Sequence, residues 1–234
     1  MKFIHQNKQI DLSNRIIIGI ILFMTTNLLA EDFWTQAMNI HYNHRLSHFN
    51  SMVVQKGSLI FLGDSITEQC NWSELFNDKR MVNRGIGGDV VEGVYDRLGF
   101  LKNCEPDALF LLIGINNLNR GDSINETFEG YKKIVNRIKN YNSKLQLYIL
   151  SILPINKEKF LGEPKITNKK IAKLNEKLKD FAKTVNAVYL DLNSKYLDSN
   201  LQLNSDYSID GLHLNGDGYL LFKDIVKKYL HKKQ

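Results

Sequence analysis

The chain is poor in residues that cross-link or interrupt a fold: it has two cysteines and three prolines among 234 residues. Cys70 and Cys104 lack a C-x-x-C or other metal-ligand spacing, and so small a number excludes a disulfide scaffold. In an exported protein the two thiols could form a disulfide; two independent, partly buried thiols are the equal alternative. With 43% apolar residues and no low-complexity segment, the composition excludes disorder and predicts a globular domain.

The chain also lacks an apolar run of about 20 residues, the length that a membrane-spanning helix needs. Its N-terminal apolar run covers residues 16–24, after basic residues up to Arg15 and before "TTNLLA", which ends at Ala30. This order predicts a secretory signal peptide over residues 1–30, with an N-terminal anchor as the alternative. We therefore expect residues 31–234 to form a single domain that is secreted or periplasmic. A membrane contact is expected only if the N-terminal segment is uncleaved.

The chain also has only a small excess of positive over negative charge. The formal net charge is +6, and Lys2, Lys8 and Arg15 against Asp11 place +2 of it in the first thirty residues. The lysines are scattered over expected helix faces and do not form one basic stripe. We therefore expect no nucleic-acid partner.

From residue 58 onward, short apolar runs alternate with amphipathic segments. The runs expected to be strands are "LIFL", "MVNRG", "DALFLLIG", "LQLYILSILP" and "AVYLDL". The segments expected to be helices are residues 33–52, 90–101, 124–141, 166–182 and 219–230. This alternation predicts an α/β fold with a five-stranded parallel sheet that helices cover on both faces.

Chemically distinctive residues stand where these elements meet. Ser65 follows the first expected strand, Gly88 the second and Asn116 the third, while Asp210 and His213 form "DGLH" just before the last helix. The carboxyl ends of parallel strands lie at one edge of a sheet. We therefore expect these five residues to gather there.

These residue types fit acyl transfer through a serine nucleophile. A hydroxyl needs a base within hydrogen-bonding reach, and that base needs a third group to orient it; His213 and Asp210 would supply both. Gly88 offers a backbone N–H and Asn116 two side-chain donors for a developing oxyanion. Taken singly, Ser65 could be a helix N-cap and the others parts of turns and loops. Their joint placement favours the catalytic interpretation.

Four ordered blocks carry a resemblance to a known family: "FLGDSIT", "NRGIGGD", "LIGINN" and "DGLHLNGDGY". With them the sequence resembles the SGNH (GDSL-type) serine hydrolases. The resemblance implies a flavodoxin-like, three-layer α/β/α sandwich over residues 31–234 and ester hydrolysis through an acyl-enzyme. It implies Ser65 as nucleophile, His213 as base and Asp210 as the group that orients it. The implied oxyanion hole is the backbone N–H of Ser65, the backbone N–H of Gly88 and the side chain of Asn116.

Two positions depart from the family pattern: "GDSI" replaces the commoner GDSL, and Asn117 stands where many members carry aspartate. The former change is near-isosteric. "GINN" and "GIGGD" resemble the catalytic subunits of platelet-activating-factor acetylhydrolases, and the chain is also similar to bacterial carbohydrate acetylesterases. These resemblances imply removal of short acyl groups, above all acetyl.

We therefore expect a small-molecule or glycan ester as substrate, on a carbohydrate of the cell envelope, and no cofactor. A lysophospholipase or thioesterase with the same residues is the nearest alternative, and a noncatalytic glycan-binding domain is an alternative of another class. The sequence leaves the oligomeric state open.

Other patterns compete less well. "GIGGDVVEG" suggests a dinucleotide loop, but Val90 occupies the third glycine position, so the fingerprint fails. A helix over residues 33–52 would place three histidines on one face: His41, His44 and His48. Because no cysteine or carboxylate pattern accompanies them, we favour a polar helix face over a metal site and expect no metal.

Two further features are candidates for a pocket wall. The polar loop between Pro154 and Pro164 follows the fourth expected strand and would border the ligand crevice. Trp72, Phe160 and Tyr207 could line that crevice or pack in the core, and core packing has at least equal weight.

Overall fold

The computed structural model describes residues 33–230. The predicted signal peptide, residues 1–30, lies outside the described residues. The chain divides into two compact units between Asn43 and His44. Residues 33–43 of the first unit are helical, and so are residues 44–51 of the second unit. Within residues 33–230, no helix is both long and apolar enough to cross a membrane.

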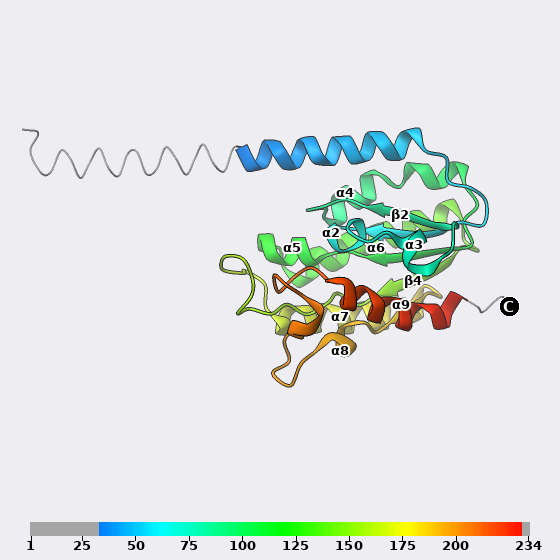
Figure 1. Ribbon diagram of the computed structural model, residues 1–234. Coiled ribbons are helices and arrows are strands. Elements are labelled where there is room, and N and C mark those ends of the chain that lie inside the picture. Colours follow the sequence, from blue (N-terminus) through cyan, green and yellow to red (C-terminus); the bar gives the residue numbers. More distant parts are fainter. Residues whose placement is uncertain (1–32, 231–234) are drawn as a thin grey trace, which may run out of the picture. The chain divides into compact units, whose positions relative to one another are not determined.

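The second unit contains a five-stranded sheet in the order β2-β1-β3-β4-β5. Two of its strands, β2 and β4, are labelled in Figure 1. The strands are β1 (Leu59–Gly63), β2 (Met81–Gly85), β3 (Ala108–Leu112), β4 (Gln146–Leu150) and β5 (Val188–Leu190). Every neighbouring pair is parallel. The predicted five-stranded parallel sheet is therefore confirmed, and all strands end at the same edge.

Helices lie in the connections between the strands and after β5. The α-helices are α2 (Ser65–Glu68), α3 (Trp72–Phe76), α4 (Val91–Asp96), α5 (Ile115–Arg120), α6 (Ile124–Tyr141), α7 (Asn168–Thr184), α8 (Asn193–Tyr196) and α9 (Gly216–Leu230). Short 3₁₀ helices cover Leu98–Asn103 and Ser205–Tyr207. The segment 90–101, expected to be one helix, is thus an α-helix followed by a 3₁₀ helix, and Arg97 separates the two. Gly99 in its second half has low helix propensity, which favours the break.

Two apolar clusters cover the two faces of the sheet. Side chains alternate along β1, so that Ile60 and Leu62 belong to one cluster and Leu59 and Phe61 to the other. The first cluster includes buried residues of α4, α6 and α7, and the second includes buried residues of α3 and α9, the red helix in Figure 1. Because each face of the parallel sheet is covered by helices, the predicted three-layer arrangement is confirmed.

An aromatic stack crosses the second face of the sheet. Phe61 of β1 lies 4.8 Å from Phe110 of β3, and Phe110 lies 4.5 Å from Tyr148 of β4, between ring centroids. Trp72 stacks on Phe61 at 3.9 Å, is 2% exposed, and donates from Nε1 to the backbone oxygen of Thr67. Trp72 is therefore a core residue that holds the turn after Ser65, not a pocket wall.

The two cysteines lie on opposite faces of the sheet. Cys70 is buried in the second cluster, and Cys104 packs against the first. Both are free thiols, so the alternative of two independent thiols is confirmed. Burial raises the pKa of the Cys70 thiol to about 12, which keeps that thiol protonated at neutral pH.

Candidate active site

A sharp turn after β1 presents Ser65 at the carboxyl edge of the sheet. The side chain of Asp64 caps α2, because its Oδ1 accepts the backbone N–H of Ile66 at 3.1 Å. Ser65 is the first helical residue, so its hydroxyl is not used as a helix cap. Gly63 is required for the turn: a Cβ there would lie 2.1 Å from the backbone oxygen of Leu112.

Ser65, His213 and Asp210 form one chain of hydrogen bonds. His213 Nε2 lies 2.9 Å from Ser65 Oγ, and His213 Nδ1 lies 2.6 Å from Asp210 Oδ2. The other carboxylate oxygen of Asp210 accepts the backbone N–H groups of Leu212 and His213. Burial raises the pKa of Asp210, but the hydrogen bonds to His213 and Leu212 outweigh it and leave that pKa below its usual value. Asp210 is therefore a carboxylate that can orient the imidazole ring.

The loop after β4 supports the turn that carries Asp210 and His213. The backbone N–H of Asn156 donates to Gly211 O at 2.8 Å, and Gly211 has φ +78°. A Cβ at Gly211 would lie 2.4 Å from Asn156 O, so only glycine fits. Ser208 Oγ also accepts the N–H of Gly211. The loop predicted to border the crevice therefore contacts the histidine-bearing turn, and Phe160 within it packs against the first apolar cluster.

Asn116 lies close to Gly88 because its side chain contacts Asp89, the residue that follows Gly88. Gly88 has φ +74° in a turn that the hydrogen bond from Asp89 N to Ile86 O closes. Asn116 Nδ2 donates to Asp89 O at 2.9 Å, which sets the orientation of the amide. An asparagine amide has a second N–H, which remains for a ligand. The backbone N–H of Ser65 is likewise at a first helical position, where the helix itself provides no acceptor.

A buried ion pair behind this turn has no counterpart in the sequence prediction. Arg97 Nε lies 2.8 Å from Asp89 Oδ2, and both side chains are at most 2% exposed. Arg97 also donates to the backbone oxygens of Gly63 and Arg84, at the ends of β1 and β2. Asp89 belongs to the "GIGGD" block, but no local pattern marks Arg97 as its partner.

Asn117, the departure from the family pattern, has a structural role. It is fully buried, and its Oδ1 accepts the N–H of Val91 at the start of α4. Its Nδ2 donates to Asp122 and Glu92. An ionised aspartate could accept but not donate, so the amide suits these acidic neighbours.

Asp64 has an unusual environment for a carboxyl group. It is 1% exposed, and its Oδ2 has no hydrogen-bond partner within the described chain. Burial raises the pKa of Asp64 to about 7, and nearby Asp89 acts in the same direction. The group therefore titrates near neutrality, directly before Ser65 in the chain.

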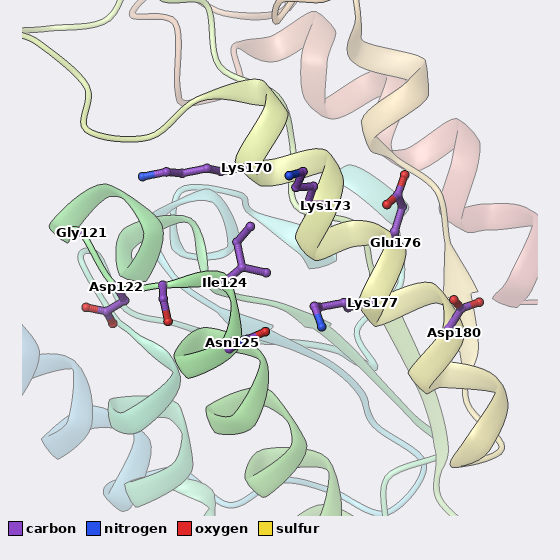
Figure 2. Close-up of a pocket in the computed structure, with 10 residues that line it drawn as sticks. Gly121, Asp122, Ile124, Asn125, Lys170, Lys173, Glu176, Lys177 and Asp180 are labelled. Carbon is purple, nitrogen blue, oxygen red and sulfur yellow. The ribbon is translucent and has the colours of Figure 1, made fainter.

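A surface pocket of about 830 Å³ lies between the start of α6 and helix α7 (Figure 2). Its lining residues are Gly121, Asp122, Ser123, Ile124, Asn125, Lys170, Lys173, Glu176, Lys177 and Asp180. None of the five predicted site residues is among them. A capping box of Ser123 and Glu126 already satisfies the start of α6. Nothing beyond its shape and its lysines marks this pocket as a site.

In residues 33–230, no cluster of three histidines, cysteines or carboxylates could hold a metal ion.

A serine–histidine–aspartate chain of this kind is typical of serine hydrolases, and it recurs on several unrelated folds. Comparison with known families agrees: the GDSL-like Lipase/Acylhydrolase family matches residues 61–221, and this chain belongs to it. It is therefore a GDSL-type acylhydrolase, with the esterase chemistry of the SGNH enzymes.

Individual relatives are more distant. Platelet-activating factor acetylhydrolase IB subunit alpha2 of Rattus norvegicus is 30% identical over 168 residues, 69% of this chain and 70% of the relative. The solved structure of a protein from Streptococcus pneumonia that is named after platelet activating factor has a TM-score of 0.77 and 27% sequence identity to this chain. The match covers 89% of this chain and 99% of that one. A GDSL-like lipase from Bacteroides thetaiotaomicron has TM-score 0.68 and 20% identity, covering 82% and 98%, and shows the fold alone.

Proposed function

We propose that the protein is a serine esterase in which Ser65 is the nucleophile, His213 the general base and Asp210 the group that orients it. The observation that carries this proposal is the 2.9 Å contact between Ser65 Oγ and His213 Nε2, continued by the 2.6 Å contact to Asp210. A hydroxyl with a base at this distance, and a base held by a carboxylate, fulfils the requirement for an activated serine.

The reaction would run in two halves. Ser65 Oγ attacks the ester carbonyl carbon while its proton passes to His213 Nε2, and the carbonyl oxygen becomes an oxyanion. The ester C–O bond then breaks, and His213 returns the proton to the departing alcohol, which leaves an acyl-Ser65. Water attacks this acyl group with His213 again as base, releasing a carboxylic acid and restoring the serine.

The oxyanion would be held by the backbone N–H groups of Ser65 and Gly88 and by the second N–H of Asn116. Donors must point at the developing charge before the reaction to be effective. The bond from Asn116 to Asp89 O supports this role, because it fixes an amide that could otherwise rotate.

Asn116→Ala is expected to lower kcat for p-nitrophenyl acetate by about 100- to 1000-fold, the loss typical of one oxyanion donor. The matched control is Asn125→Ala, at an exposed position on α6. Steady-state kinetics measure both. An Asn116→Ala enzyme with the kcat of the parent would remove this side chain from the oxyanion hole.

For the substrate, we propose a short acyl ester, above all acetyl, on a carbohydrate of the cell envelope. The acetylhydrolase name of the curated relatives supports a short acyl group. The predicted signal peptide supports an extracytoplasmic substrate and a secreted or periplasmic location.

A series of p-nitrophenyl esters from C2 to C12, together with acetylated glycans, tests this substrate. We expect kcat/KM to be highest at C2 and acetate to be released from the glycans. A maximum at C8 or longer would contradict the acetyl assignment and favour a lysophospholipase, whereas glycan binding without any ester hydrolysis would favour a noncatalytic domain.

A further inference from the structure

A helix before the family-matched region contacts the turn that contains Gly88. Arg45 lies in helical residues 44–51, outside the matched residues 61–221. Its Nη2 donates to Gly85 O at 3.1 Å, and its Nε lies 2.7 Å from Glu68 Oε1. The side chains of Arg45 and Glu68 are 26% and 16% exposed, so water screens this ion pair only in part.

Glu68 contacts both Arg45 and the glycine-rich turn, Gly85 to Gly88. Its second carboxylate oxygen, Oε2, accepts the backbone N–H of Gly87, the residue before Gly88. Glu68 is also the last residue of α2, the short helix that begins with Ser65. A Cβ at Gly85 would lie 2.3 Å from the backbone nitrogen of Glu68, so α2 and the end of β2 are in direct contact. The Arg45–Glu68 pair therefore links the end of α2, the helix that begins with Ser65, to the residue directly before Gly88.

The aromatic ring of Phe49 packs against the guanidinium of Arg45. Phe49, one helical turn further on, is 5% exposed. The guanidinium of Arg45 lies 4.8 Å from its ring centroid, and that of Arg84 lies 4.7 Å from the same centroid. A guanidinium at this distance from a ring face is attracted by the negative charge of that face. Phe49, Glu68 and Gly85 therefore each contact Arg45 at the end of β2.

We propose that Arg45 is a positioning residue that holds the Gly85–Gly88 turn, through Glu68, in the arrangement in which Gly88 N–H can stabilise an oxyanion. This inference rests on the proposed esterase function. Three glycines within four residues give the turn wide conformational freedom, and an oxyanion donor is effective only when it is held in place beforehand. Arg45 supplies that constraint from outside the four motif blocks.

Arg45→Met is the first test, because methionine keeps an apolar chain against Phe49 and removes the donors. We expect kcat for p-nitrophenyl acetate to fall about 10- to 100-fold with little change in KM, as for displacement of a reacting group by a remote change. Glu68→Gln should cause a similar loss. The double variant should be no worse than the more impaired single variant, because the two residues act as one unit. The matched control is Lys56→Met, which removes an exposed ion pair with Glu105.

The second measurement separates positioning from general weakening. A trifluoromethyl ketone forms a tetrahedral adduct on an active serine, so its Ki should rise in Arg45→Met in proportion to the loss of kcat/KM. The ratio of the Arg45→Met rate to the parent rate should be the same at each pH tested, because the His213–Asp210 contact is untouched. Arg45→Lys, which keeps the charge but has one donor group, should recover part of the activity.

Three results would overturn the inference. They are an Arg45→Met enzyme with kcat within twofold of the parent, a loss confined to KM, or an unchanged inhibitor Ki alongside reduced activity. If Arg45→Met does not fold, the same three criteria are applied to Glu68→Gln, provided that its melting temperature equals that of the parent. The proposed function fails separately, because a parent protein without Ser65-dependent esterase activity would show it before any Arg45 variant is made.

Discussion

Ser65→Ala is expected to abolish hydrolysis of p-nitrophenyl acetate, with kcat reduced by about 10⁵- to 10⁶-fold. The alanine protein lacks the atom that forms the acyl-enzyme, so His213 has no hydroxyl to deprotonate. Oxyanion donors and substrate binding alone leave a small residual rate above that in water. Because the hydroxyl makes no capping bond in α2, the substitution should leave the fold intact.

Two measurements make this result specific to Ser65. A fluorophosphonate should add one adduct to the parent protein and none to Ser65→Ala, as seen by intact mass. Ser73→Ala, at an exposed position on α3, is the matched control and should retain full activity and labelling. Equal activity of Ser65→Ala and the parent would exclude the esterase mechanism proposed for this site.

Asp64→Asn is expected to reduce the pH dependence of stability strongly. The pKa of Asp64 is raised from 3.8 to about 7 in the folded chain. Between these values the folded state binds more protons than the unfolded state, so the free energy of unfolding falls as pH rises. The stabilisation is complete below the unfolded pKa and is lost once pH passes the folded pKa. A shift of about 3 units corresponds to roughly 4 kcal/mol.

Urea unfolding of both proteins at pH 4 and pH 8 measures this effect. The parent should lose about 4 kcal/mol relative to Asp64→Asn between these pH values. The asparagine oxygen can still accept the N–H of Ile66, so the cap survives. The control is Asp217→Asn, at an exposed position on α9. Parallel pH dependences for the parent and Asp64→Asn would show that Asp64 is ionised when buried.

Local sequence patterns were enough to predict most helices and strands and to select the candidate site residues. Residues 124–141 are a helix with the expected bounds, because apolar residues recur there at helical spacing and Ser123 caps the start. The contact between Asp210 and His213 also depends on near neighbours, since a carboxylate that accepts the N–H groups two and three residues later brings the ring into reach. Such interactions need little knowledge of the fold.

Other expectations needed the fold to decide them. Trp72 fitted a pocket wall and the core equally well by sequence, and only its stacking on Phe61 assigns it to the core. The two cysteines allowed either pairing or independence, and the sheet between their clusters separates them. The helix expected over residues 90–101 is interrupted at Arg97, whose side chain pairs with buried Asp89.

The sequence by itself determined the parallel sheet and the gathering of Ser65, Gly88, Asn116, Asp210 and His213 at one edge, because the strand ends follow from local apolar runs and parallel topology places those ends together. Only the tertiary structure decided which charged groups support that edge. Arg97 reaches Gly63 across 34 residues and Arg45 reaches Gly85 across 40, and Asp64 has an oxygen without a partner. Such pairings depend on burial and on three-dimensional distance, neither of which leaves a periodic signal in the chain.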